Sequence, residues 1–232
     1  MKKSVLELGG SDAFIVLPSA DLDACVRTAV TARVQNNGQS CIAAKRFIVL
    51  DAVFDEFLAR FTEAMDALVV GDPFDPATDV GPIVTEAQRD ELVGQVARAR
   101  AQGATVHTGT VPAGDGWYFA PTVLSGITVD MPVAQEEIFG PVAMVVRVLD
   151  LDAALEAANA TTFGLGSSVW GHDQAEIDRC IGGLEAGAVF VNAMVASTPE
   201  LPFGGIKRSG YGRELSEIGL KEFANVKTVW IA

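Results

Sequence analysis

Apolar segments of strand length alternate with longer amphipathic segments along most of the chain. Candidate strands lie at residues 13–17, 46–50, 104–109, 143–149, 167–171 and 188–194. Apolar residues at helical spacing fill most of the gaps, at about residues 21–36, 51–68, 85–102, 151–160 and 174–186. Apolar strands separated by helices are typical of a parallel sheet that is covered on both faces. We therefore expect an α/β fold, with an open, twisted, mostly parallel sheet and helices on both faces.

Capping residues support two of these helices. Ser19 or Asp21 can cap the first helix, because a short polar side chain accepts a hydrogen bond from the first helical turn. Thr85 and Gln88 have the spacing of a capping box, and Gly103 is suited to end the helix that they begin. The helical boundaries near residues 21 and 85 are thus predicted by side-chain chemistry as well as by periodicity.

Composition and charge narrow the class of protein. Of the 232 residues, 49% are hydrophobic and 20% are charged, which predicts a folded chain with a sizeable core. The formal net charge of −13 leaves no broad basic surface and argues against nucleic acid or an anionic membrane as a partner. No segment approaches the roughly 18 apolar residues of a membrane span, and no signal peptide is visible.

The three cysteines are Cys25, Cys41 and Cys180, and they show no CxxC spacing. With two histidines far apart, the pattern predicts neither a zinc site nor a disulfide framework, and it favours reduced thiols in the cytoplasm. Cys25 and Cys180 fall on apolar helix faces, so we interpret both as core residues. Cys41 lies in NNGQSCIAAKR, between a Gly-Gln turn and small apolar residues. A nucleophilic thiol needs a depressed pKa and an open approach, and the local sequence leaves a structural thiol equally open.

Other candidate chemistry lies in three polar segments. Glu7 leads into the Gly-Gly turn of LELGG, where a backbone can approach closely. QEEIFGPV, at residues 135–142, has paired acids, of which one is expected to face solvent. STPELPFGGIKRSGYGRE, at residues 197–214, is a long glycine-rich loop of the kind that often carries a site. Each segment also has a plain reading as a solvated turn or surface loop.

LELGG, GQSC, EEIFGPV and LPFGGIKRSGYGRE, in this order, resemble the catalytic half of the aldehyde dehydrogenase superfamily. Glu7 and Cys41 are separated by 34 residues, as is typical of that family, and the resemblance covers nearly the whole chain. NNGQSCIAAKRFIV looks most similar to the NAD(P)-dependent succinate-semialdehyde dehydrogenase branch. The resemblance implies a thiol-dependent oxidoreductase that acts on a small aldehyde with NAD or NADP.

The resemblance also implies residue roles for the thiol chemistry. Cys41 would attack the aldehyde carbon and give a thiohemiacetal and then a thioester. Glu7 would be the general base that activates Cys41 or the hydrolytic water. The backbone N–H of Cys41 would hold the developing oxyanion together with an Asn side chain from the other half of the family's enzymes.

For the cofactor, the resemblance implies that Glu137 binds the ribose next to the nicotinamide and that Phe139 packs against the cofactor. Gln88 matches a position that often contacts the cofactor, although the basic residue common three places later is Glu91 here. Candidates for substrate binding are Gln35, at a position that lines the aldehyde tunnel in relatives, and Arg33 and Ser197, which could bind a substrate carboxylate. No metal ligand is expected.

The resemblance divides the chain into a catalytic domain, residues 1–225, and a C-terminal arm strand, residues 226–232, that would pair with another subunit. The family's N-terminal dinucleotide-binding domain is expected to be absent, so we expect little dehydrogenase activity from the 232 residues alone. Two alternatives stay open at this stage. The chain could be a non-catalytic remnant or oligomerising interaction domain, or a cofactor-independent thiol esterase that uses Cys41 and Glu7.

Overall fold

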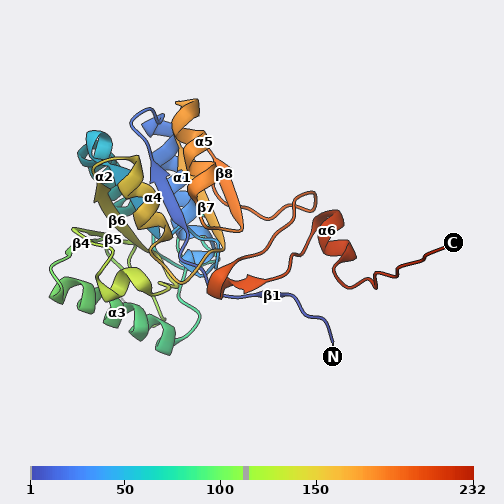
Figure 1. Ribbon diagram of the computed structural model, residues 1–232. Helices are drawn as coiled ribbons and strands as arrows, with labels where there is room; N and C mark the ends of the chain where they lie inside the picture. Colours follow the sequence, from blue (N-terminus) through green and yellow to red (C-terminus); the bar gives the residue numbers. More distant parts are fainter. Residues whose placement is uncertain (1, 112–114) are drawn as a thin grey trace.

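The computed structural model describes residues 2–111 and 115–232 and is built on a seven-stranded sheet (Figure 1). The strands are β2 (Ala13–Val16), β3 (Arg46–Leu50), β4 (Thr105–Thr108), β5 (Thr122–Ser125), β6 (Val142–Val148), β7 (Gly166–Trp170) and β8 (Ala188–Val191). Their spatial order is β4-β5-β6-β3-β2-β7-β8, and only the β4–β5 pair is antiparallel. The predicted α/β fold with a mostly parallel sheet is thereby confirmed.

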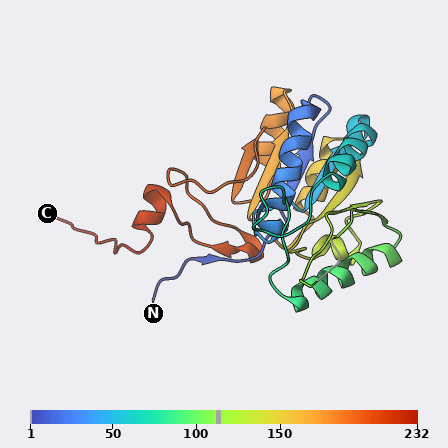
Figure 2. The ribbon, with the colours of Figure 1, turned by 180° about the vertical axis from the view of Figure 1, so that it is seen from behind.

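Helices cover both faces of this sheet, as the opposite views in Figures 1 and 2 show. They are α1 (Leu22–Val34), α2 (Asp51–Asp66), α3 (Glu86–Ala101), α4 (Leu151–Asn159) and α5 (Gln174–Gly183). Alternate residues of each strand point to opposite faces. Phe14 and Phe47 therefore pack in one core with α1 and α2, whereas Ile15 and Ile48 pack in the other with α3, α4 and α5. Cys25 and Cys180 are fully buried in these cores, which confirms them as packing residues.

The structure differs from the sequence prediction at several boundaries. β5 was not expected, because its threonine and serine interrupt the apolar run, although all four of its residues are buried. β8 ends at Val191 because Asn192 turns the backbone to a φ of 51°. A further short helix, α6 (Ser216–Lys221), follows Leu215, which has a φ of 61°.

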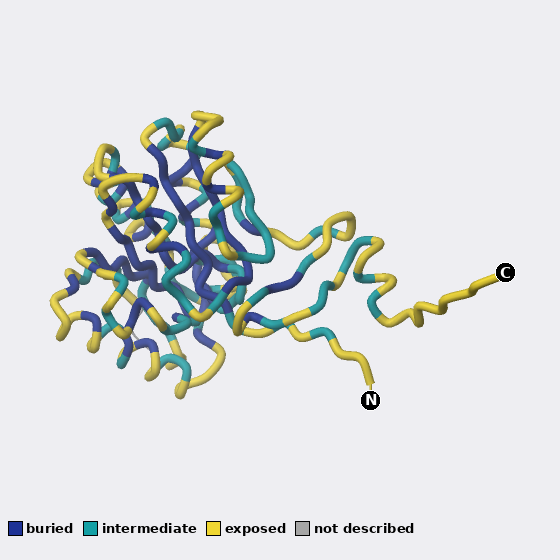
Figure 3. The backbone as a smooth tube through the Cα atoms, viewed as in Figure 1, coloured by how far each residue is buried: buried dark blue, intermediate teal, exposed yellow. Residues whose placement is uncertain are grey.

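The two ends of the chain lie away from the main sheet (Figure 1). A short strand, β1 (Leu6–Glu7), pairs antiparallel with β9 (Gly210–Tyr211) of the glycine-rich loop. Residues 226–232 form no strand with any other part of the described chain, and Figure 3 shows them as exposed. Their apolar side chains are open to solvent, with Trp230 88% exposed. No helix of the described part of the chain has the length and apolar character to cross a membrane.

Candidate active site

The motif residues gather where four neighbouring parallel strands begin. Asp12 directly precedes β2, Lys45 precedes β3, Pro141 precedes β6 and Leu165 precedes β7. Parallel strands start at the same edge of a sheet, so segments that are far apart in the sequence come together there. The site therefore lies at the amino ends of the strands, whereas ligands of open α/β sheets commonly bind at the carboxyl ends.

The turn that carries Cys41 is shaped by the residues that follow α1. A 3₁₀ turn, Gln35–Gly38, comes first, and Asn36 and Asn37 adopt left-handed φ values of 50° and 56°. Asn37 then anchors the turn to a neighbouring loop, accepting from the Gly81 N–H at 2.9 Å and donating to the Pro82 carbonyl at 3.1 Å. Asparagine tolerates this conformation better than most residues, so the pair NN is suited to this turn.

Gly38 brings the Cys41 turn into contact with the EEIFGPV segment. Its φ is +74°, and a Cβ at this position would overlap the backbone of Gly140 and Pro141. Only glycine fits such a close approach in the left-handed region. The structure thus places GQSC directly beside EEIFGPV.

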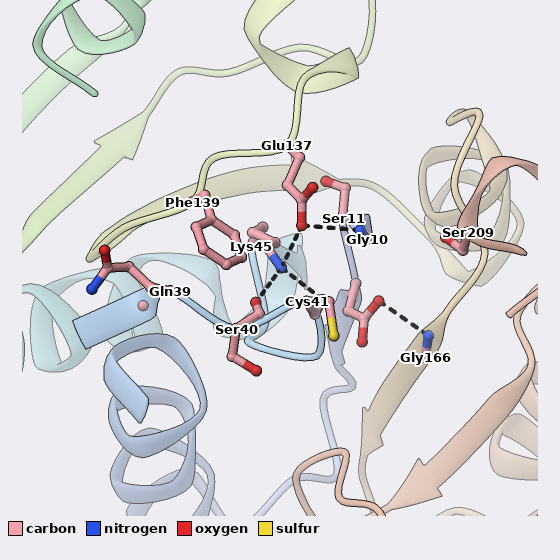
Figure 4. Close-up of polar contacts among 12 residues, drawn as sticks. Gly10, Ser11, Gln39, Ser40, Cys41, Lys45, Glu137, Phe139, Gly166 and Ser209 are labelled. Carbon is pink, nitrogen blue, oxygen red and sulfur yellow. Dashed lines mark hydrogen bonds and ion pairs between the residues drawn. The ribbon is translucent and has the colours of Figure 1, made fainter. Parts of the chain in front are cut away.

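Lys45 links the same two segments by polar contacts (Figure 4). Its Nζ donates to the carbonyl oxygens of Ser40, at 2.8 Å, and Cys41, at 2.7 Å. It also lies 3.6 Å from Glu137 Oε1, and its side chain is 0% exposed. Lys45 therefore holds the Cys41 turn and the Glu137 carboxylate at one charged centre.

The glycines of LELGG complete this contact. The Gly10 N–H donates to Glu137 Oε1 at 3.0 Å, and a Cβ at Gly10 would come within 2.7 Å of the Cys41 carbonyl oxygen. A Cβ at Gly9 would overlap the Glu137 carboxylate. The close backbone approach expected of the Gly-Gly pair is confirmed.

Asp12 adds a buried acid to the cluster. Its Oδ1 accepts from the Gly166 N–H at 3.0 Å, and burial raises the pKa of this carboxyl to about 7 although Lys45 acts to lower it. Burial and, to a smaller extent, nearby Arg33 lower the pKa of Lys45 to about 8, although Asp12 and Glu137 act in the opposite direction. Each buried charge is thus partly stabilised by an opposite one.

Cys41 itself is partly buried in this turn. Burial raises the pKa of its thiol, and the Lys45 ammonium and the Ile42 N–H oppose that change. Asp12 and Glu137 raise the pKa further. The site therefore does not give the depressed thiol pKa that the sequence reasoning required of a nucleophile, so thiolate formation depends on a base.

Glu7 lies in a second cluster. A Cβ at Gly204 would come within 2.9 Å of Glu7 Oε1, so the carboxylate packs against the glycine-rich loop. Burial raises the pKa of Glu7, Glu214 raises it further, and Arg213 opposes both. Both carboxylate oxygens are buried, and the nearby Gly205 N–H is a weak partner that also acts to lower the pKa of Glu7. No hydrogen bond joins Glu7 to Cys41 within residues 2–111 and 115–232.

The residues expected at the cofactor lie close to one another. Gln88 Nε2 donates to the Phe139 carbonyl oxygen at 3.2 Å, while the Gln88 N–H is capped by Thr85 Oγ1. Glu137 and Phe139 share one segment and lie in the same view of the site (Figure 4). Glu91, where a basic residue is common, forms an ion pair with Arg98 at 3.0 Å.

The three expected substrate residues have different surroundings. Arg33 is fully buried and its Nη2 donates to the Gly38 carbonyl at 2.9 Å, which supports a structural role in the turn rather than contact with a substrate. The Gln35 amide nitrogen is buried and has no hydrogen-bond partner among the described residues. Ser197 is exposed and lines a pocket between β8 and Leu201–Phe203. The structure does not gather these residues around Cys41 in one contact network.

Sequence reasoning missed Lys45 and Asp12. Both are charged residues placed immediately before an apolar strand, in KRFIVL and SDAFIV. Parallel strands begin at the same edge of a sheet. A charged residue directly before each of two predicted parallel strands therefore indicated that the two charges lie close together at that edge.

The polar groups fit a nicotinamide cofactor better than a metal ion. Glu137 Oε1 is occupied by Gly10 and Lys45, and no described residue donates a hydrogen bond to Oε2. The Glu137 side chain is 22% exposed, so this second oxygen can accept from a ribose hydroxyl. Among residues 2–111 and 115–232, no group of three or more His, Cys, Asp or Glu side chains is arranged to hold a metal ion.

Comparison with known proteins agrees with this geometry. The family model described as "Aldehyde dehydrogenase family" matches residues 1–229, and the chain belongs to the aldehyde dehydrogenase family. Its relatives include the succinate-semialdehyde dehydrogenase [NADP(+)] 1 of Mycobacterium ulcerans, strain Agy99, which is 62% identical over 232 residues. The corresponding protein of Mycobacterium tuberculosis, strain ATCC 25618 / H37Rv, is 59% identical over 233 residues. Each alignment covers 100% of this chain and 51% of the relative, so the chain spans about half the length of the curated relatives it matches.

A solved relative has the same fold. The succinic semialdehyde dehydrogenase from Streptococcus pyogenes, determined in complex with NADP+, superimposes with a TM-score of 0.93 at 39% sequence identity. The match covers 98% of this chain and 50% of that one. The motif resemblance found in the sequence is thus confirmed at the level of family and fold.

Proposed function

We propose that this chain is the catalytic part of an aldehyde dehydrogenase that oxidises a small aldehyde to a carboxylic acid, with NADP or NAD as the hydride acceptor. The observation that carries the proposal is the contact between the Cys41 turn and Glu137, made through Lys45 and Gly10. It puts a thiol and a candidate ribose-binding carboxylate at one edge of the sheet. The relatives named above favour succinate semialdehyde as the aldehyde and NADP as the cofactor.

Cys41 begins the reaction. Its thiol first loses its proton to a base from the solvent, the thiolate sulfur then adds to the aldehyde carbon, and the carbonyl electron pair moves to oxygen, where the Cys41 N–H can donate a hydrogen bond. When bound, the nicotinamide cofactor accepts a hydride from that carbon. The carbon is thereby oxidised and stays attached to Cys41 as a thioester.

Glu7 serves the hydrolytic half of the reaction. Both oxygens of its carboxylate are buried, and burial raises its pKa, which suits a base that works near neutral pH. It takes a proton from water, the water oxygen adds to the thioester carbon, and the Cys41 sulfur leaves. The product is a carboxylic acid, and the thiol is regenerated.

Glu137, Phe139 and Gln88 hold the cofactor in this proposal. Glu137 Oε2 would accept from a ribose hydroxyl, and the Gln88 contact with the Phe139 carbonyl fixes the backbone of the same segment. Gln35 and Ser197 remain candidates for the aldehyde side. Arg33 stabilises the turn that carries Cys41 and does not contact the substrate, because its side chain is 0% exposed.

Self-association through residues 226–232 is part of the proposal. The segment is exposed, most of its side chains are apolar, and it pairs with no other described strand, which suits strand addition to a second copy of the chain. The three thiols are free, with Cys25 and Cys180 buried, in keeping with a cytoplasmic location.

A chimera tests the function. The segment of the Mycobacterium tuberculosis relative that matches this chain is replaced by residues 1–232, and NADP reduction is measured with succinate semialdehyde. We expect a folded chimera to reduce NADP, and Cys41→Ala to abolish the reaction, while the 232-residue chain alone gives little. A folded chimera without NADP reduction would rule the proposal out. Cys41-dependent hydrolysis of an activated ester by that inactive chimera would instead favour the thiol esterase.

A further inference from the structure

Lys45 places an enclosed ammonium group against the Cys41 turn. An ammonium group has three N–H donors and no acceptor. Its Nζ is within 2.8 Å of the Ser40 carbonyl oxygen and 2.7 Å of the Cys41 carbonyl oxygen, and 3.6 Å from Glu137 Oε1. Two of its donors are therefore hydrogen-bonded to carbonyl oxygens of the thiol turn, and the ammonium group forms an ion pair with Glu137 of the candidate cofactor segment.

Burial of this charge is costly and is not needed for packing. A fully buried cation loses its hydration, and an apolar side chain of similar length would fill the same space without that loss. Asp12, Glu137 and Cys41 face Lys45 and favour its charged form, whereas Arg33 opposes it. The charge is thus stabilised by groups of the site itself.

The two carbonyl contacts fix the direction of two N–H groups. In a trans peptide the N–H points away from the carbonyl of the same unit. The Ser40 carbonyl shares its peptide with the Cys41 N–H, and the Cys41 carbonyl shares its peptide with the Ile42 N–H. Holding both carbonyls on one Nζ therefore turns both N–H groups away from Lys45. The Cys41 N–H is the oxyanion donor of the proposed mechanism.

We propose that Lys45 is a positioning residue that orients the Cys41 N–H toward the oxyanion and ties the thiol turn to Glu137. The inference rests on the proposed function, because it takes Cys41 as the nucleophile. The Lys45 ammonium group also lowers the pKa of the Cys41 thiol, whereas burial, Asp12 and Glu137 raise it. Loss of Lys45 thus has two separable effects, one on thiolate formation and one on attack at a carbonyl.

Two reactions of Cys41 on the full 232-residue chain separate these effects. Iodoacetamide reports thiolate formation without building an oxyanion, whereas acylation by p-nitrophenyl acetate builds one. The variants are Lys45→Met and Glu137→Gln, and the control is Lys221→Met, an exposed lysine on α6 that pairs with Glu217 and makes the same change in charge. Peptide mass spectrometry locates each adduct, and circular dichroism checks the fold.

We expect the alkylation profile of Lys45→Met to shift to higher pH and that of Glu137→Gln to lower pH, with no shift in the control. At saturating pH, Lys45→Met should lower the ratio of acylation to alkylation by about tenfold or more, since loss of one oxyanion donor costs about a hundredfold or more in other enzymes. If Lys45→Met fails to fold, Lys45→Gln, which also removes the charge, decides by the same alkylation profile and the same ratio of acylation to alkylation. Folded variants with wild-type profiles and ratio overturn the proposal.

The proposed function fails in a different way. Absence of any Cys41 acylation in the wild-type chain would count against Cys41 as the nucleophile. The alkylation profiles need neither aldehyde nor cofactor, so they still decide whether Lys45 acts on the Cys41 turn.

Discussion

Gly38 and Gly140 meet backbone to backbone, so closely that a Cβ on Gly38 would overlap the carbonyl group of Gly140. This contact seats the turn of Cys41 against the segment of Glu137 before any side chain takes part. Gly38 also has a φ of +74°, a conformation that an L side chain rarely adopts. Two glycines, which have no side-chain chemistry of their own, therefore help to position the candidate active site.

The substitution Gly38→Ala should destabilise the chain by roughly 2–4 kcal/mol, from the left-handed conformation and from overpacking against Gly140. Urea unfolding measures the change. The matched control is Gly182→Ala on α5, where a Cβ meets nothing within 4 Å. That change should be neutral or stabilise by up to about 1 kcal/mol. Equal unfolding free energies for the two variants would contradict the Gly38–Gly140 contact.

The three thiols should differ in alkylation. Cys25 and Cys180 are 0% exposed, and burial raises the pKa of both, that of Cys180 to about 11. They should stay unlabelled until the chain is denatured. Burial also raises the pKa of Cys41, so its labelling should rise by about tenfold per pH unit across neutral pH, since only the thiolate reacts. A half-maximal rate below about pH 8.5, the ordinary value for a free thiol, would show that this account of Cys41 is wrong.

Glu214→Gln should lower the pKa of Glu7. Glu214 is one of the groups that raise this pKa, after burial, so removal of its charge makes ionisation of Glu7 easier. A ¹³C NMR titration of the Glu7 carboxyl measures the shift. Glu217→Gln, an exposed acid on α6 that pairs with Lys221, is the control and should leave Glu7 unchanged. An unchanged titration in Glu214→Gln would place Glu7 elsewhere than beside the glycine-rich loop.

The proposed arm makes a prediction about assembly. Thr228 lies in the exposed apolar segment 226–232, and Thr228→Pro removes a backbone donor that an intermolecular strand needs. Light scattering after size exclusion should show a lower mass for Thr228→Pro than for the wild-type chain. Thr228→Val keeps the donor and should keep the wild-type mass. A monomeric wild-type chain, or equal masses for both variants, would count against the arm.

The sequence was sufficient to predict the parallel sheet, because β3 and β6 are apolar except for Arg46 and Arg147, and because α2 and α3 lie between them in the sequence. β5 escaped prediction since its two hydroxyl residues broke the pattern, although its neighbours in the sheet bury it. The strand propensity of a segment depends on its own residues, whereas the burial of β5 depends on strands that lie far away in the sequence.

Motifs located the site more accurately than they described its electrostatics. Glu137 and Cys41 were expected at one site, and the structure joins them through Lys45, which no motif indicated. A nucleophilic Cys41 would require a depressed thiol pKa, but burial raises this pKa, because desolvation depends on the packed turn rather than on neighbours in the sequence. The resemblance paired Glu7 with Cys41, whereas the glycine-rich loop holds the Glu7 carboxylate in its own cluster.

Acylation of Cys41 by an aldehyde is the most direct test of the proposed function. An aldehyde can leave an acyl group on sulfur only after it has lost a hydride, so the adduct reports nucleophile and oxidation together. In the chimera with Glu7→Gln, which slows hydrolysis, succinate semialdehyde and NADP should leave a succinyl thioester on the Cys41 peptide, one for each NADPH formed. NADPH formation with an unmodified Cys41 peptide, or a succinyl group on another residue, would contradict the account.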